Sequence, residues 1–362
     1  MLSGVISRRS LLMCASALTL CLGLAVSAVP TPAASQPGEL VNGKFQPLPD
    51  GYPNKPIQII VVDEPGSADS IYANQLIQAA QPFSPVPLKI EHRIDFSTFG
   101  TWEALAWLLH QGKPADDGYI TFVYTAPDQM IDLLAVDIKN AVGVDFSDLR
   151  TVIATEEIPL VMFQRKDAPW GHTVQDLVKY AKEHPGKIRH VTGGVGSGGD
   201  ATVQAWSREL GIKVKDIIGG STPERALAVA AGEADLTAVP LDTMLPHYQA
   251  GRVDVLVVAG KQKLSGIWAD KTVAGDLGLK YDPVQRRGFA ITPKVPDARR
   301  DWLFKLLAHA SQQPGFVANR QQIPALRNVV LGNTEVRNIS RAIYDQMLPI
   351  YKEMGNYWGD KK

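Results

Sequence analysis

The chain has 362 residues, in which 37 lysines and arginines balance 37 aspartates and glutamates. This zero net charge, without any basic stripe interleaved with aromatic residues, excludes a chain built to bind nucleic acid. The only two cysteines, Cys14 and Cys21, lie close to the N-terminus, inside the leader described next. The rest of the chain therefore has no disulfide and no cysteine-based metal site.

The N-terminal segment predicts a cleavable signal peptide over residues 1–28. Arg8 and Arg9 precede an uncharged apolar run over residues 11–29, and Val26-Ser27-Ala28 offers small residues for cleavage. A membrane anchor is the alternative, because about 18 apolar residues span a bilayer, but this run is rich in Ala, Ser and Thr. The arginine pair resembles a twin-arginine signal, and a general secretory signal is the other option. We expect a periplasmic protein whose mature part, having lost two arginines and no acid, carries a net charge near 0 − 2 = −2.

Strand-like and helix-like segments alternate along the remaining residues, after a Pro- and Gly-rich stretch over residues 29–54 that predicts a flexible linker. Strands are expected at 57–62, 86–90, 119–124, 151–154, 160–165, 188–191, 236–239, 253–259 and 287–291, and helices at 71–80, 101–109, 174–184, 201–210, 224–231 and 299–311. This alternation indicates an α/β architecture with parallel sheets, and about 330 residues suggest two domains.

Two expected strand-to-helix turns contain glycines and small polar residues. One covers residues 62–69 and the other residues 193–200. Backbone N–H groups at a helix N-terminus bind anions, and α/β sheets bind ligands at the carboxyl ends of their strands. Because the turns are more than a hundred residues apart, we expect one in each domain, facing a shared cleft.

The second turn also allows two other interpretations. Residues 194–199 fit G-x-G-x-x-G, and Asp216 follows at the distance expected of a ribose-binding acid, which would indicate a dinucleotide-dependent oxidoreductase. A glycine-rich turn without any ligand is the other alternative. Catalytic signatures are absent, and the neighbouring Glu156 and Glu157 would point to opposite faces of a strand rather than act as a pair. We therefore expect a binding protein that has no cofactor and no metal.

Short motifs in a fixed order then resemble the periplasmic solute-binding proteins of tripartite tricarboxylate transporters, known as the Bug family. The resemblance runs from Tyr52 to the C-terminus and rests on Tyr52-Pro53-Asn54-Lys55-Pro56-Ile57, Asp117-Gly118-Tyr119, Asp148-Leu149-Arg150, Arg165-Lys166-Asp167-Ala168-Pro169-Trp170, Pro185-Gly186-Lys187, Gly194-Val195-Gly196-Ser197-Gly198, Ala231-Gly232-Glu233-Ala234-Asp235 and Leu245-Pro246-His247-Tyr248-Gln249-Ala250-Gly251.

The resemblance implies a two-domain periplasmic-binding-protein (Venus-flytrap) fold in which each domain is a sheet flanked by helices. Residues 55–155 and 285–362 would form domain 1, and residues 156–284 domain 2. The cleft would hold a small organic carboxylate and deliver it to a membrane permease, with the protein acting as a monomer and without catalysis. The ligand-binding residues implied are Gly66, Ser67, Ala68 and Asp69 on one wall, Gly196, Ser197, Gly198, Gly199 and Asp200 on the other, and Asp242 at the far end of the ligand.

The chain departs from the family pattern at several of these positions. The first turn is one glycine shorter, Asp200 replaces a common histidine, and residues 217–221 lack the Tyr and Lys of the family. These changes argue against a highly charged tricarboxylate. Phe96 and Phe99 suggest a less polar ligand, with packing as the alternative. Asp200 and Asp242 have the alternative role of helix N-caps, and a ligand sensor for a membrane kinase is the alternative to a transport receptor.

Overall fold

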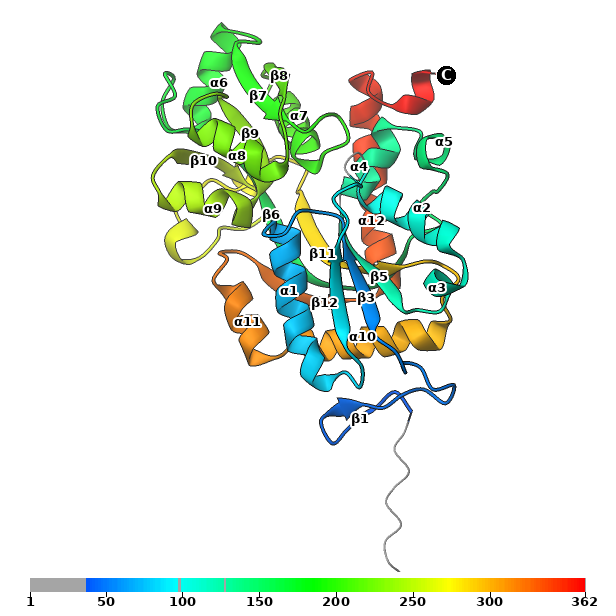
Figure 1. The fold of residues 1–362 in the computed structure, drawn as a ribbon. Helices are drawn as coiled ribbons and strands as arrows, with labels where there is room; N and C mark the ends of the chain where they lie inside the picture. The colour runs from blue at the N-terminus through cyan, green and yellow to red at the C-terminus, as the bar shows by residue number, and fades with distance from the viewer. Residues whose placement is uncertain (1–36, 97–98, 127, 362) are drawn as a thin grey trace, which may run out of the picture. The chain divides into compact units, whose positions relative to one another are not determined.

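The computed structural model describes residues 37–96, 99–126 and 128–361 (Figure 1). The predicted signal peptide and its twin-arginine alternative lie outside the described residues. Within the described ranges, none of the helices combines the length and the apolar character needed to cross a membrane.

The described part of the expected linker is folded rather than flexible. Strands β1 (Leu40–Val41) and β2 (Lys44–Phe45) form a hairpin whose Phe45 is buried in the apolar core. The indole N–H of Trp302 donates to the carbonyl of Gln46 at 2.9 Å, and the hydroxyl of the buried Tyr52 donates to the carbonyl of Gly118 at 2.7 Å. Because these aromatic anchors fix the segment, the Pro and Gly content that predicted a linker here specifies turns.

Three parallel strands form the first part of the main sheet. The central strand β3 (Ile57–Val61) pairs with β4 (Leu88–His92) on one side and β5 (Ile120–Ala126) on the other. The connections contain α1 (Ala68–Ala80), the 3₁₀ turn η1 (Gln81–Phe83), α2 (Thr101–Gln111) and α3 (Lys113–Asp116), and the chain then continues through α4 (Asp128–Ala135) and α5 (Ile138–Val142). Buried apolar residues of α1 and α2 pack on these strands, as expected for parallel sheets covered by helices.

A second group of strands repeats this arrangement. Strand β7 (Ile188–Thr192) pairs in parallel with β8 (Val214–Ile218) and β9 (Leu236–Pro240), and β10 (Val253–Val258) runs alongside β6. The helical segments of this group are α6 (Val174–Glu183), α7 (Gly198–Glu209), α8 (Thr222–Ala230), α9 (Leu241–Gln249), η2 (Gly266–Trp268) and η3 (Ala274–Leu277).

Long strands join the two groups. Strand β6 (Arg150–Arg165) pairs through its first half with β11 (Val284–Ile291) and β12 (Arg327–Leu331), and through its second half with β9 and β10. Figure 1 shows β6 and β11 running between the strands β3–β5 and the strands β7–β10. All the pairings of β6, and that of β11 with β5, are antiparallel, so the expectation of purely parallel sheets was wrong for these strands.

The sequence predicted two short strands where β6 is continuous. Glu156, Glu157 and Pro159 interrupt its apolar pattern, and a proline normally argues against a central strand. The structure buries both glutamates among arginines and places Pro159 opposite Val284, where the chain passes from one group of strands to the other.

The last third of the chain adds α10 (Asp297–Ser311), α11 (Pro314–Gln321), α12 (Asn333–Glu353) and η4 (Trp358–Lys361). Helix α12 packs along α4, and its Met347 and Tyr351 join an apolar cluster that contains Ile131 and Trp206. The C-terminal helix therefore contacts elements of both strand groups.

Candidate binding site

The two glycine-containing turns each begin a helix, and a serine caps each one. The Ser67 hydroxyl accepts the N–H of Ser70 at 3.1 Å at the start of α1, directly after Gly66, whose φ of +90° suits glycine. The Ser197 hydroxyl accepts the N–H of Asp200 at 3.2 Å at the start of α7. Both hydroxyls are therefore engaged in capping, and α7 begins at Gly198 rather than at the expected residue 201.

A small cavity of about 60 Å³ lies at the N-terminus of α7. It is lined by Leu160, Ser197, Gly198, Gly199, Thr222, Arg225, Ala238, Val239, Pro240 and Gln285. A Cβ atom on Gly199 would lie 2.2 Å from the carbonyl oxygen of Ala238, so only glycine lets the first turn of α7 rest against β9.

Arg225 places a buried positive charge in the wall of this cavity. Its side chain, from α8, is 7% exposed and donates to the Gly220 carbonyl at 2.7 Å and to the Thr222 hydroxyl at 3.0 Å. A Cβ atom on Gly193 would lie 2.6 Å from its Nη1, so the glycine lets the guanidinium approach the turn before α7. Sequence reasoning missed Arg225, because a single arginine on an amphipathic helix resembles any surface cation.

Gln285 enters the same cavity from β11. The residue is 8% exposed, and among the described residues its Oε1 has no hydrogen-bond partner. Side chains two apart on a strand share a face, so Arg287 lies next to Gln285 on the same side of β11. No sequence motif marked either residue as functional.

Arg287 brings together Asp69, expected on one wall of the site, and Asp242, expected at the far end of the ligand. Its side chain is 1% exposed; Nε donates to Asp69 at 2.6 Å, and Nη1 donates to Asp242 at 2.7 Å and to Glu156 at 3.0 Å. Arg320 donates to the same Glu156 at 2.8 and 2.9 Å. Asp69 lies in the first turn of α1 and Asp242 in the first turn of α9, so this one guanidinium joins the two strand groups.

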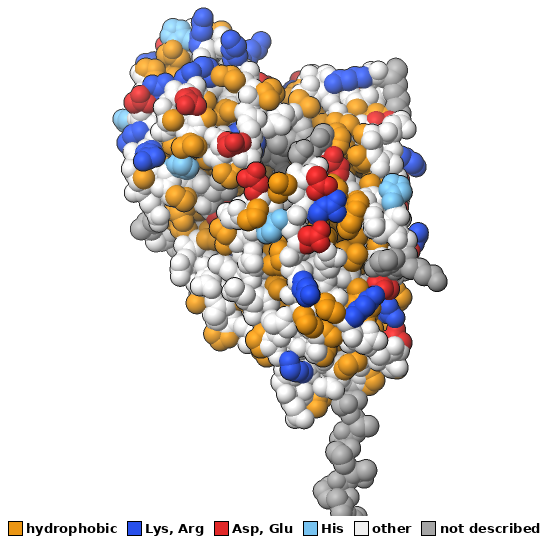
Figure 2. All heavy atoms as spheres, in the orientation of Figure 1, with side chains coloured by type: hydrophobic (Ala, Val, Ile, Leu, Met, Phe, Trp, Pro, Cys, Tyr) orange, Lys and Arg blue, Asp and Glu red, His pale blue; other side chains and the backbone are white. Residues whose placement is uncertain are grey.

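This cluster has more acids than bases, since Arg287 and Arg320 face Asp69, Glu156 and Asp242. Burial raises the pKa of Asp69 to about 6, although Arg287 opposes the change. Figure 2 shows acidic side chains on both margins of the hollow above α1. The acids of this cluster are not among the described residues that line the cavity.

Other predicted site residues face elsewhere. A Cβ atom on Gly196 would lie 2.7 Å from the Asp132 carboxylate of α4, so Gly196 contacts that helix and is not among the lining residues. Asp200 is buried and accepts from the Thr192 hydroxyl at 3.1 Å, and its alternative role as an N-cap was wrong because Ser197 caps α7. For Asp242 the N-cap alternative was also wrong, because Pro240 holds that position.

Two further expectations concern aromatic residues and adjacent glutamates. Phe96 and Phe99 pack against the apolar cluster around α2, in agreement with the packing alternative. Glu156 and Glu157 do point to opposite faces, because Glu157 pairs with Arg286 and Arg327 rather than with Arg287. Glu157 also borders a second cavity of about 470 Å³, which is lined in part by Lys261, Lys263 and Asp282.

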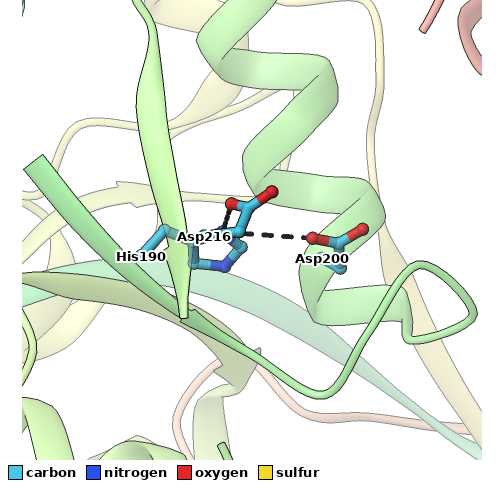
Figure 3. Close-up of side chains that lie close together, drawn as sticks. All are labelled: His190, Asp200 and Asp216. Atoms are coloured by element: carbon cyan, nitrogen blue, oxygen red, sulfur yellow. Dashed lines mark hydrogen bonds and ion pairs between the residues drawn. The ribbon is translucent and has the colours of Figure 1, made fainter. Parts of the chain in front are cut away.

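His190, Asp200 and Asp216 form a cluster that could hold a metal, since one ligand atom from each lies within 4.8 Å of the others (Figure 3). His190 Nδ1 lies 2.9 Å from Asp216 and 3.9 Å from Asp200. A histidine that binds a metal normally donates its other ring N–H to a partner, yet Nε2 of His190 is buried with none among the described residues. The hydrogen bond between His190 Nδ1 and Asp216 accounts for the position of the ring without a metal.

The same contacts argue against the dinucleotide alternative, because they occupy the carboxylate that would bind the ribose. Asp216, its proposed ribose-binding acid, is engaged by His190 and also accepts from the Gln204 amide at 2.9 Å.

Comparisons with known proteins agree with this architecture. The sequence profile of the family described as "Tripartite tricarboxylate transporter family receptor" matches residues 113–324. A Bordetella pertussis protein of the group named UPF0065 is 25% identical over 316 residues, which cover 84% of this chain and 91% of that protein.

Solved structures show the same fold at low identity. The periplasmic binding protein BugD superposes with a TM-score of 0.70 at 18% identity, covering 84% of this chain and 99% of BugD. A Rhodopseudomonas palustris protein solved with adipate gives 0.72 at 16% identity, covering 84% and 98%. MatC from Rhodopseudomonas palustris, solved with bound malate, gives 0.68 at 15% identity, covering 83% and 99%.

These structures carry the two-domain periplasmic-binding-protein fold, and the chain has the same fold. The profile match spans more than half of the sequence and includes the α7 turn, Arg225 and Gln285. The chain belongs to the tripartite tricarboxylate transporter receptor family of periplasmic solute-binding proteins.

Proposed function

We propose that this protein is a non-enzymatic periplasmic receptor that binds a small organic carboxylate at the N-terminus of α7 and delivers it to the membrane permease of a tripartite transporter. The observation that carries the proposal is the lining of the small cavity: Arg225 contributes a buried cation, and none of the described lining residues is an acid. Domain closure over the ligand would give the permease a surface to recognise.

The chemistry of this lining suits a carboxylate. The first turn of a helix leaves backbone N–H groups without intrahelical acceptors, and its dipole favours negative charge there. A guanidinium beside that turn adds charge-assisted hydrogen bonds. Gly198 and Gly199 place no side chain on the first two residues of α7, so a carboxylate can approach their backbone. Asp200, also in the first turn, is buried and turns to Thr192.

Two other observations support the proposal. The structural relatives solved with malate and with adipate bind small carboxylates in the same fold. A cavity of about 60 Å³ accepts a carboxylate and a few neighbouring atoms, whereas a dinucleotide is several times larger, so the oxidoreductase alternative has no support here.

A thermal-shift screen against mono-, di-, tri- and aromatic carboxylates, with NAD and NADP included, tests this proposal. A ligand at about 100 times its Kd stabilises the fold by about 2.7 kcal/mol, which is a clear rise in Tm. The variant Arg225→Gln should weaken carboxylate binding by roughly tenfold to a hundredfold, because a hydrogen bond to a charged group contributes about 1.5–3 kcal/mol.

Arg341→Gln provides a matched control, since Arg341 is exposed on α12 and pairs with Asp345 one turn along the same helix. The unliganded Tm of each variant shows whether the fold is intact. A shift produced by the dinucleotides alone, or a carboxylate shift that Arg225→Gln leaves unchanged, would contradict the proposal.

A further inference from the structure

We propose that the ligand is a monocarboxylate that carries a hydroxyl or ammonium group near its carboxylate, and that Gln285 recognises this group. The inference rests on the proposed function, because it assumes that the carboxylate lies beside Arg225. It adds a specificity-determining residue and a narrower class of ligand.

The first observation is the unsatisfied oxygen of Gln285. Among the described residues its buried Oε1 has no partner, and a buried acceptor that lacks a donor is costly. Gln285 lines the same small cavity as Gly198, Gly199 and Arg225. Because the cavity is so small, a ligand group that reaches Oε1 must lie within a bond or two of the carboxylate. A hydroxyl or ammonium group there would supply the missing hydrogen bond.

The second observation is what lies next to Gln285. Arg287, its neighbour on the same face of β11, already donates to Asp69, Glu156 and Asp242. The cluster holds two arginines and three acids, a charge of 2 − 3 = −1 when all are ionised. Burial is the main cause of the raised pKa of Asp69, and Asp242 adds to it. A second carboxylate on the ligand would therefore meet acids rather than an available cation.

Titration calorimetry with a four-carbon series tests the inference on the full protein. The probes are butanoate, 2-hydroxybutanoate, 2-aminobutanoate, 2-oxobutanoate and succinate. We expect 2-hydroxybutanoate or 2-aminobutanoate to bind roughly tenfold more tightly than butanoate, because the ligand donor satisfies the buried amide oxygen. Succinate should bind more weakly than butanoate.

The variant Gln285→Met keeps the size of the side chain and removes the amide. It should lose the preference for the hydroxy and amino acids over butanoate. Gln175→Met, at an exposed position of α6, is the matched control and should keep that preference. Unliganded Tm values of both variants at or above that of the wild type establish that loss of folding is not the cause.

Several results would overturn the inference. One is equal binding of butanoate and its hydroxy and amino derivatives by the wild type. A preference for 2-oxobutanoate over 2-hydroxybutanoate would mean that Gln285 donates rather than accepts. Tight binding of succinate would contradict the role of the acids. If none of the probes bound, or if binding were insensitive to Arg225→Gln, the proposed function itself would fail and this inference with it.

Discussion

The carboxylate of Asp69 should make the stability of the protein depend on pH in an unusual direction. Burial raises its pKa from the ordinary 3.8 to about 6, and the contact with Arg287 only partly offsets this. The folded state then binds the proton more tightly than the unfolded state, so stability falls as pH rises from about 4 to about 6. The difference between the two pKa values corresponds to about 3 kcal/mol in the free energy of unfolding. This contribution is present below about pH 4 and lost above pH 7.

Replacing Asp69 by Asn, which stays neutral, removes this dependence. Urea unfolding of wild type and Asp69→Asn between pH 4 and pH 8 measures it, because the difference between the two proteins cancels the titration of other groups. We expect the variant to gain about 3 kcal/mol relative to the wild type across this range.

Asp95→Asn is the control, since Asp95 is exposed and its hydrogen bonds with Arg93 lower its pKa. The difference in unfolding free energy between Asp95→Asn and the wild type should change with pH in the opposite direction, or not change at all. The reasoning about Asp69 is refuted if the Asp69→Asn difference is flat, or if the variant loses relative stability as pH rises.

Two further changes test the packing around the site. Gly199→Ala should destabilise the fold by several kcal/mol in urea unfolding, because the new Cβ would meet the backbone of β9. Gly315→Ala in α11, where a Cβ meets nothing within 4 Å, should stabilise the fold by about 0.5–1 kcal/mol. Equal effects of the two substitutions would contradict the packing argument. Glu156→Gln should cost about 3–5 kcal/mol, because the buried Arg320 loses the acid with which it pairs, whereas Arg287 keeps Asp69 and Asp242. Glu157→Gln should cost less, because its partner Arg327 is exposed, and the reverse order would contradict this account.

The expected elements of the fold follow from short-range signals. Apolar runs such as residues 57–61 and 188–191 gave strands, and the glycine turns located the starts of α1 and α7. The continuity of β6 could not be predicted, because the ion pairs that bury Glu156 involve Arg287 and Arg320, more than a hundred residues away.

The candidate site was predicted only where local sequence specifies it. Asp69 and Asp242 were expected beside the ligand, and the structure joins them through Arg287, which no motif marked. Arg225 and Gln285 acquire their roles from burial against distant segments, and single residues on a helix or strand give no sequence signal of that. For Asp200 the contact with ligand stays a prediction, because a turn residue can face either the ligand or the sheet behind it, and here its side chain contacts Thr192.

A crystal structure of the protein with a carboxylate that raises its Tm tests the central claim most directly. The account predicts carboxylate oxygens within about 3.2 Å of both the Arg225 guanidinium and the first backbone N–H groups of α7. Electron density for the ligand in the larger cavity beside Lys261 and Lys263, with the α7 cavity holding only water, would contradict it.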